Sequence, residues 1–162
     1  MLKAFFLFFL FLNVLYAQSY SFTEVRYSDA IGKSMQLNGE ITFKKEGLEI
    51  KYPKSQRVLN YDGEEISFFE DKKLIELPEE QISNMMHYFD ILKLLHDGNE
   101  DELKSRFTIK ELDGKTFLSP TGALKYYIEH IELLKINNTL KYIKLFLKNN
   151  DTITINITNE IS

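Results

Sequence analysis

The sequence predicts a mostly β domain with some α structure (α+β): a curved antiparallel sheet, or incomplete β-barrel, with a helical lid on its concave face. Two observations carry this prediction. Stretches of alternating polar and apolar residues, separated by short turns, occupy both ends of the chain, and one amphipathic stretch lies between them. Strands joined by tight turns pair antiparallel. A helix between two such groups of strands packs naturally against one face of their sheet.

The first 17 residues have the pattern of a cleavable secretory signal. Lys3 provides a positive charge, residues 4–15 form an apolar run interrupted by Asn13, and cleavage can follow Ala17. The run is shorter than the roughly 20 residues of a membrane-spanning helix, although an uncleaved N-terminal anchor is the alternative. We therefore expect secretion through the inner membrane, removal of residues 1–17, and one domain over residues 18–162.

The first group of strands follows this signal. The expected strands cover residues 20–27, 35–43, 48–52, 58–61, 66–69 and 74–77. In the second of them, Leu37, Ile41 and Phe43 share one face, which is the period-two pattern of a half-buried strand. The dipeptide Asp62-Gly63 favours a tight hairpin turn, so this group reads as a meander of neighbouring strands.

The middle of the chain changes to a helical period. Apolar residues recur at steps of three and four through one stretch: Ile82, Met85, Met86, Phe89, Leu92 and Leu95. Pro78 and the glutamates that follow it suit a helix start, and Gly98 suits its end. We expect a helix over residues 79–96, with a further helical turn at residues 100–104.

The second group of strands completes the chain. Strands are expected at residues 107–112, 115–118, 126–136, 139–147 and 151–158. Asp113-Gly114 and Asn137-Asn138 provide turns between them. The last strand alternates most regularly, and it should direct Ile153, Ile155 and Ile157 inward.

Composition and motifs argue against several function classes. The net charge is −4 and the lysines are scattered, which does not favour binding to nucleic acid. The chain has no cysteine, so it has no disulfide, no catalytic thiolate and no lipid-modified N-terminal cysteine. His87, His96 and His130 lack metal-ligand spacing, and there is no phosphate-binding loop or serine-nucleophile motif. We expect no cofactor, no metal and no enzymatic activity.

The mature domain is rich in apolar and aromatic residues, and these could line a ligand cavity between the sheet and the helix. Adjacent methionines on the helix suit a deformable contact with an apolar ligand. An ordinary filled core is the alternative, and composition alone favours it. The candidate ligand-binding residues are Phe43, Leu48, Ile50, Phe68, Met85, Met86, Phe89, Leu92, Ile109 and Phe117.

Several short motifs occur in an order that resembles the LolA/LolB superfamily of periplasmic lipoprotein carriers. The motifs are Phe22-Thr23-Glu24, residues 39–44, residues 48–53 with Pro53, Asp62-Gly63, residues 66–69 and residues 117–120. The resemblance covers most of residues 20–157. It implies an incomplete antiparallel barrel with a helical lid, whose cavity shields lipoprotein acyl chains on their way to the outer membrane. Three departures make the chain resemble a shortened or divergent member: the family's helix before the first strand is missing, Lys45-Glu46 stands where the carrier has Arg-Pro, and the sequence stops soon after Ile157.

These features together predict a soluble, monomeric periplasmic carrier that acts as a chaperone in lipoprotein transport and outer-membrane biogenesis. The implied partners are lipoproteins or other acylated lipids, an inner-membrane lipoprotein-releasing ABC transporter and an outer-membrane receptor. The alternative is an envelope module of the same fold that binds or senses lipids or proteins without shuttling cargo.

Overall fold

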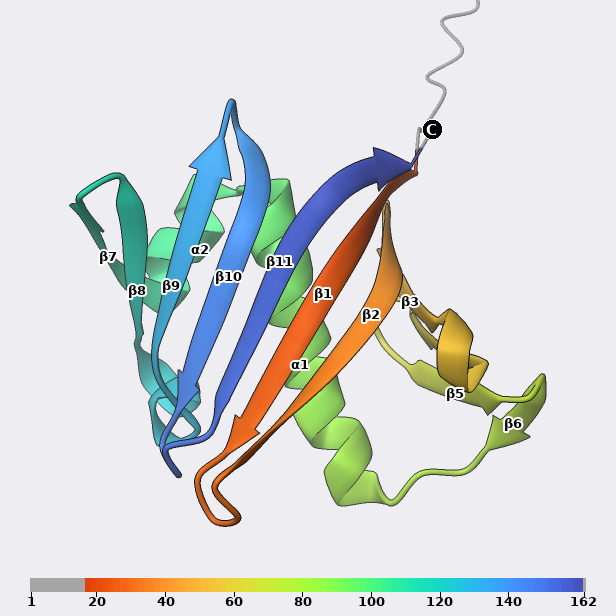
Figure 1. Cartoon of the computed structure of the whole chain (residues 1–162). Coiled ribbons are helices and arrows are strands. Elements are labelled where there is room, and N and C mark those ends of the chain that lie inside the picture. Colours follow the sequence, from red (N-terminus) through yellow and green to blue (C-terminus); the bar gives the residue numbers. More distant parts are fainter. Residues whose placement is uncertain (1–16, 162) are drawn as a thin grey trace, which may run out of the picture.

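In the computed structural model, residues 17–161 are described and form one antiparallel sheet of eleven strands with two α-helices on the same side of it (Figure 1). The expected signal peptide lies outside the described residues, except for Ala17. The elements are β1 (Gln18–Ser28), β2 (Lys33–Lys44), β3 (Gly47–Tyr52), η1 (Pro53–Ser55), β4 (Arg57–Tyr61), β5 (Ile66–Glu70), β6 (Lys73–Ile75), α1 (Glu79–Asp97), α2 (Glu100–Arg106), β7 (Phe107–Leu112), β8 (Lys115–Pro120), η2 (Gly122–Tyr126), β9 (Ile128–Ile136), β10 (Thr139–Leu147) and β11 (Thr152–Ile161).

The two groups of strands meet at the centre of the sheet. The strand order is β6-β5-β4-β3-β2-β1-β11-β10-β9-β8-β7, so β1 pairs with β2 on one side and with the last strand, β11, on the other. The sheet stays open because its end strands, β6 and β7, pair with inner neighbours and not with each other. In Figure 1 the sheet curves around α1. The predicted fold class, a curved open antiparallel sheet with a helix on its concave face, is confirmed.

Helix α1 packs its apolar face onto the sheet and contacts β3, β5 and β10. Its buried residues lie towards its C-terminal end: Phe89, Ile91, Leu92, Leu94 and Leu95. The helix ends as expected at Gly98, which adopts φ 68° and donates its N–H to the Leu94 carbonyl. The predicted short turn after it is a longer helix, α2, and the Asn99 side chain caps it by accepting from the Glu102 N–H. Neither helix of residues 17–161 is long and apolar enough to cross a membrane.

Tight turns connect the strands as their sequences predict. Asp113-Gly114 and Asn137-Asn138 both have positive φ at the two central residues, the geometry of a turn that matches strand twist. The expected start of the strand at residue 126 is wrong, because Gly122–Tyr126 form a 3-10 helix and β9 begins at Ile128. The aromatic and β-branched residues here favour a strand, so the sequence did not predict the turn. A hydrogen bond from the Tyr127 N–H to the Leu124 carbonyl closes it.

Candidate functional site

The space between the sheet and α1 is divided into a filled half and an open half. In the filled half, around the C-terminal part of α1, Leu48, Ile50 and Leu92 are at most 1% exposed. In the open half, around the N-terminal part of α1, lies a cavity of about 910 Å³. This volume is within the range of roughly 300–1,000 Å³ that is usual for small-molecule sites. The ligand cavity and the filled core, posed as alternatives by the sequence, therefore occur together.

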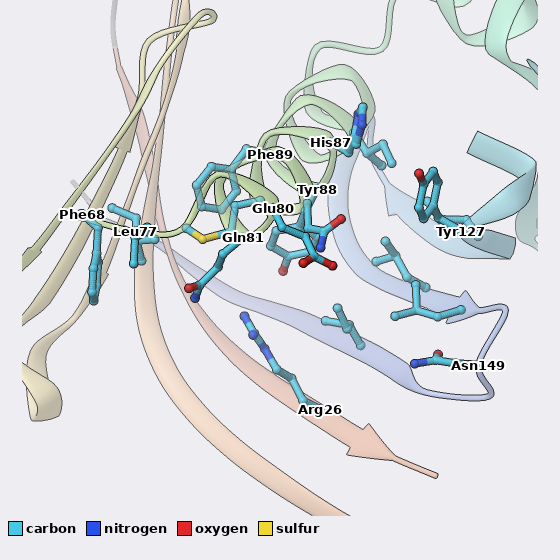
Figure 2. Close-up of a pocket in the computed structure, with 18 of the residues that line it drawn as sticks. Arg26, Phe68, Leu77, Glu80, Gln81, His87, Tyr88, Phe89, Tyr127 and Asn149 are labelled. Carbon is cyan, nitrogen blue, oxygen red and sulfur yellow. The ribbon is translucent and has the colours of Figure 1, made fainter. Parts of the chain in front are cut away.

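The cavity has mainly apolar walls from both the sheet and the helix. Figure 2 shows Phe89 on α1 and Phe68 on β5 near one end, with Tyr127 at the other. Side chains from β2, β4, β9, β10 and β11 complete the apolar wall: Leu37, Leu59, Ile128, Leu145 and Ile153. Tyr126 and Tyr127, which are 70% and 59% exposed, also line the cavity. The cavity thus communicates with solvent past aromatic side chains.

Nine of the ten predicted site residues separate into three sets. Phe68, Met85 and Phe89 line the cavity. Phe43, Leu48, Ile50 and Leu92 belong to the filled half, and Met86 packs against the buried cluster without lining the cavity. Ile109 shares the inner face with Leu118, but it lies on the edge strand β7 and is 36% exposed, away from the cavity.

The assignment of Phe117 to the concave face is wrong. Phe117 pairs with Glu132 of β9 and Lys110 of β7, both on the outer face, whereas its neighbour Leu118 pairs with Ile131 and is buried. Successive strand residues point to opposite faces, so an error of one position moves a side chain across the sheet.

The polar centre of the site comes from strand β1. Phe22, Glu24 and Arg26 pair with Ile157, Ile155 and Ile153 of β11, so all three point to the concave face. Glu24 is completely buried. One carboxylate oxygen accepts a hydrogen bond from Arg26 Nε. The other accepts from the Tyr52 hydroxyl at 3.1 Å and the Tyr88 hydroxyl at 3.3 Å. These bonds satisfy the buried carboxylate, as burial of a charge requires.

This cluster connects three elements under the helix. Glu24 and Arg26 belong to β1, Tyr52 to β3 and Tyr88 to α1, and Arg26, Tyr52 and Tyr88 all line the cavity. Burial opposes the charged form of Arg26, yet the charge of Glu24 and the hydrogen bond between them hold the pKa of Arg26 above its ordinary value. Burial, with the charge of Glu24, also raises the pKa of Tyr52 and the pKa of Tyr88. Both tyrosines therefore remain protonated at neutral pH and donate to Glu24.

Sequence reasoning missed this cluster, although one signal was present. In β1, every second residue points inward. The inward positions hold the apolar residues Tyr20 and Phe22 and then the charged residues Glu24 and Arg26. Charged residues at inward positions are rarely buried without a partner. Nothing in the sequence indicated that Tyr52 and Tyr88, 28 and 64 positions away from Glu24, would supply two of the donors.

The residues at the opposite, filled end include His96. Its ring stacks on Phe43 with centroids 3.7 Å apart, and its Nε2 lies 3.0 Å from the Gln18 side-chain oxygen. Burial lowers the pKa of His96, and Asp97 opposes this effect only in part. Across residues 17–161, no group of three or more acidic, histidine or cysteine side chains is arranged to hold a metal ion.

Comparison with solved structures gives a distant structural likeness. No family model and no curated protein matches the sequence. A solved structure of a LolA superfamily protein from Nitrosomonas europaea is 8% identical in sequence, and the match covers 91% of this chain and 86% of that one with a TM-score of 0.43. A likeness at this identity and TM-score does not indicate function. The fold is defined by the strand order and by the position of α1 against the sheet.

Proposed function

We propose that this protein is a periplasmic carrier that binds the acyl chains of lipoproteins between its concave sheet and α1, and moves them towards the outer membrane. The observation that supports binding of an acyl chain is the cavity of about 910 Å³ with apolar walls from both layers. Transfer of an acyl chain from water to such a site is favourable by about 0.8 kcal/mol per methylene group. The protein binds and releases its cargo without making or breaking bonds.

In this proposal the cargo comes from an inner-membrane lipoprotein-releasing ABC transporter and passes to an outer-membrane receptor. The expected signal at residues 1–17 is the reason to place the protein in the periplasm. Movement of α1 away from the sheet opens the cavity for loading and release. The open end of the cavity, beside Tyr126 and Tyr127, is the natural route for an acyl chain.

The test uses the chain from Gln18 onward, with a fluorescent acyl probe and mass spectrometry of extracted lipid. Leu59 lines the cavity and is partly buried, so Leu59→Trp should fill part of it and weaken probe binding roughly tenfold or more. Ile136 is 51% exposed outside the cavity, so Ile136→Trp is the matched control and should bind like the unaltered chain. If the unaltered chain carries no lipid and takes up no probe, acyl binding is ruled out.

The filled half of the interior favours a second candidate, an envelope module that binds or senses lipid without shuttling it. Leu48, Ile50 and Leu92 occupy space that a carrier of several acyl chains would use. A transfer assay separates the two functions. A carrier loaded with fluorescent lipopeptide delivers it from donor to acceptor vesicles faster than spontaneous exchange, whereas a sensor binds the lipopeptide and leaves that rate unchanged.

A further inference from the structure

The Arg26 guanidinium lines the cavity, and most of its hydrogen-bonding capacity is unused. Arg26 carries five N–H donors. Arg26 donates one of these, from Nε, to Glu24. The Tyr52 hydroxyl lies close by, but it already donates to Glu24 and can accept no more than about two further bonds. At least two N–H groups at the end of the guanidinium are left for other partners.

The geometry directs those donors into the cavity. Figure 2 shows the Arg26 side chain rising from β1 towards Gln81 and Tyr88 of α1. The side chain of Arg26 is 45% exposed, whereas the side chain of Glu24 is completely buried. A ligand in the cavity therefore meets the N–H edge of the guanidinium, while the carboxylate that holds Arg26 in place is covered.

The other charged groups in the wall also favour a negative ligand. Arg57 and Lys148 line the same cavity, and Glu80 is the one acidic residue among the described residues that line it. Arg57 donates from Nε to Glu70 at 2.7 Å, and, like Arg26, it keeps N–H groups at the end of its guanidinium for a ligand. The apolar walls and these cations together match an amphiphile with one apolar chain and one negatively charged end.

We propose that Arg26 anchors the oxyanion head group, a carboxylate or a phosphate, of a single-chain lipid whose acyl chain occupies the apolar part of the cavity. This inference rests on the proposed acyl binding and adds the class of head group. Glu24 is a positioning residue, because its bond to Nε fixes the guanidinium with its remaining donors towards the ligand. Guanidinium groups bind carboxylates and phosphates with two parallel hydrogen bonds, which gives orientation as well as affinity.

The test compares three ligands that share one hexadecyl chain: palmitate, hexadecyl phosphate and hexadecanol. The variant is Glu24→Gln with Arg26→Gln, which removes both charges together and leaves no buried charge unpaired. The matched control is Lys115→Gln with Glu132→Gln, an ion pair of 3.6 Å whose Glu132 lies beside Phe117 on the outer face. Affinities are measured by titration calorimetry, and circular dichroism verifies that each variant is folded.

The unaltered protein should bind palmitate or hexadecyl phosphate more tightly than hexadecanol. In the Glu24/Arg26 variant, the dissociation constant of the anionic ligand should rise roughly ten- to a hundredfold, the loss expected for a charge-assisted pair. The dissociation constant of hexadecanol should change by no more than about twofold in this variant. The control variant should bind all three ligands as the unaltered protein does. The two anionic ligands distinguish a carboxylate site from a phosphate site, and preferential binding of either supports the proposal.

Three outcomes overturn it. Equal affinity of the unaltered protein for hexadecanol and the anionic ligands, or an unchanged affinity of the variant, rejects the head-group site and leaves acyl binding intact. Binding of none of the three ligands rejects both proposals. If the variant does not fold, the unaltered protein decides, because palmitate should shift the ¹⁵N resonance of Arg26 Nε and hexadecanol should not; equal shifts reject the proposal.

Discussion

Replacement of Glu24 by alanine tests how strongly the buried polar cluster stabilises the fold. The carboxylate is completely buried and accepts from Arg26, Tyr52 and Tyr88. Removal of one partner from a fully buried ion pair costs about 3–5 kcal/mol. Arg26 is 45% exposed and can be hydrated from the cavity, so its share of this cost is smaller. Each tyrosine hydroxyl loses a bond that contributes about 1 kcal/mol. We expect a loss of about 3 kcal/mol in the free energy of unfolding.

The assay is urea-induced unfolding of the chain from Gln18 onward, followed by far-ultraviolet circular dichroism and tyrosine fluorescence, since the chain has no tryptophan. Glu129→Ala is the control, because Glu129 is an exposed glutamate on β9 and its loss should change stability by less than about 0.5 kcal/mol. Glu24→Gln, which keeps one acceptor oxygen, should lie between the two. A loss below about 1 kcal/mol for Glu24→Ala would refute the reasoning that this carboxylate holds the three elements together.

Two further predictions concern the filled half and one turn. The pKa of His96 lies below its ordinary value of 6.5, so as the pH falls below that value the unfolded chain gains a proton that the folded chain does not yet bind, and stability falls. His96→Phe should remove this part of the pH dependence between about pH 7 and the lowered pKa, measured as the urea midpoint; an unchanged profile would contradict it. Gly47 has φ 155°, and a Cβ there would lie 1.9 Å from the Tyr61 carbonyl oxygen, so Gly47→Ala should cost more than about 2 kcal/mol. Gly32→Ala, at φ 59° with open space around it, should cost about 1 kcal/mol, and equal melting temperatures of the two variants would count against the steric argument.

Local sequence was enough to predict most elements of the fold. Alternation in β2 and β11, the helical period of α1 and the turn dipeptides before β8 and β10 all depend on neighbouring residues, which is why they could be read directly. The antiparallel pairing of adjacent strands followed from the short turns. The pairing of β1 with β11 was not predicted, because it joins residues more than a hundred positions apart and no local pattern records it.

The candidate site was predicted in part. The sequence indicated apolar residues on α1 and the sheet, and Phe68, Met85 and Phe89 do line the cavity. It did not indicate which half of the interior is filled, since Leu48 and Met85 belong to equally apolar stretches. Phe117 was assigned to the wrong face because the parity of a short strand is set by its pairing with β9, and a shift of one residue reverses it.

The sequence by itself determined the class of the fold, the helix between two groups of strands and the apolar character of the inner face. Those properties arise from periodicity and turn chemistry within short windows. The tertiary structure alone decided that half of the interior is open and that Glu24, Arg26, Tyr52 and Tyr88 meet there. Cavity volume depends on how side chains from distant strands fill a shared space. The buried charge is stable only because three elements bring donors to it, and long-range packing of β1, β3 and α1 sets that arrangement.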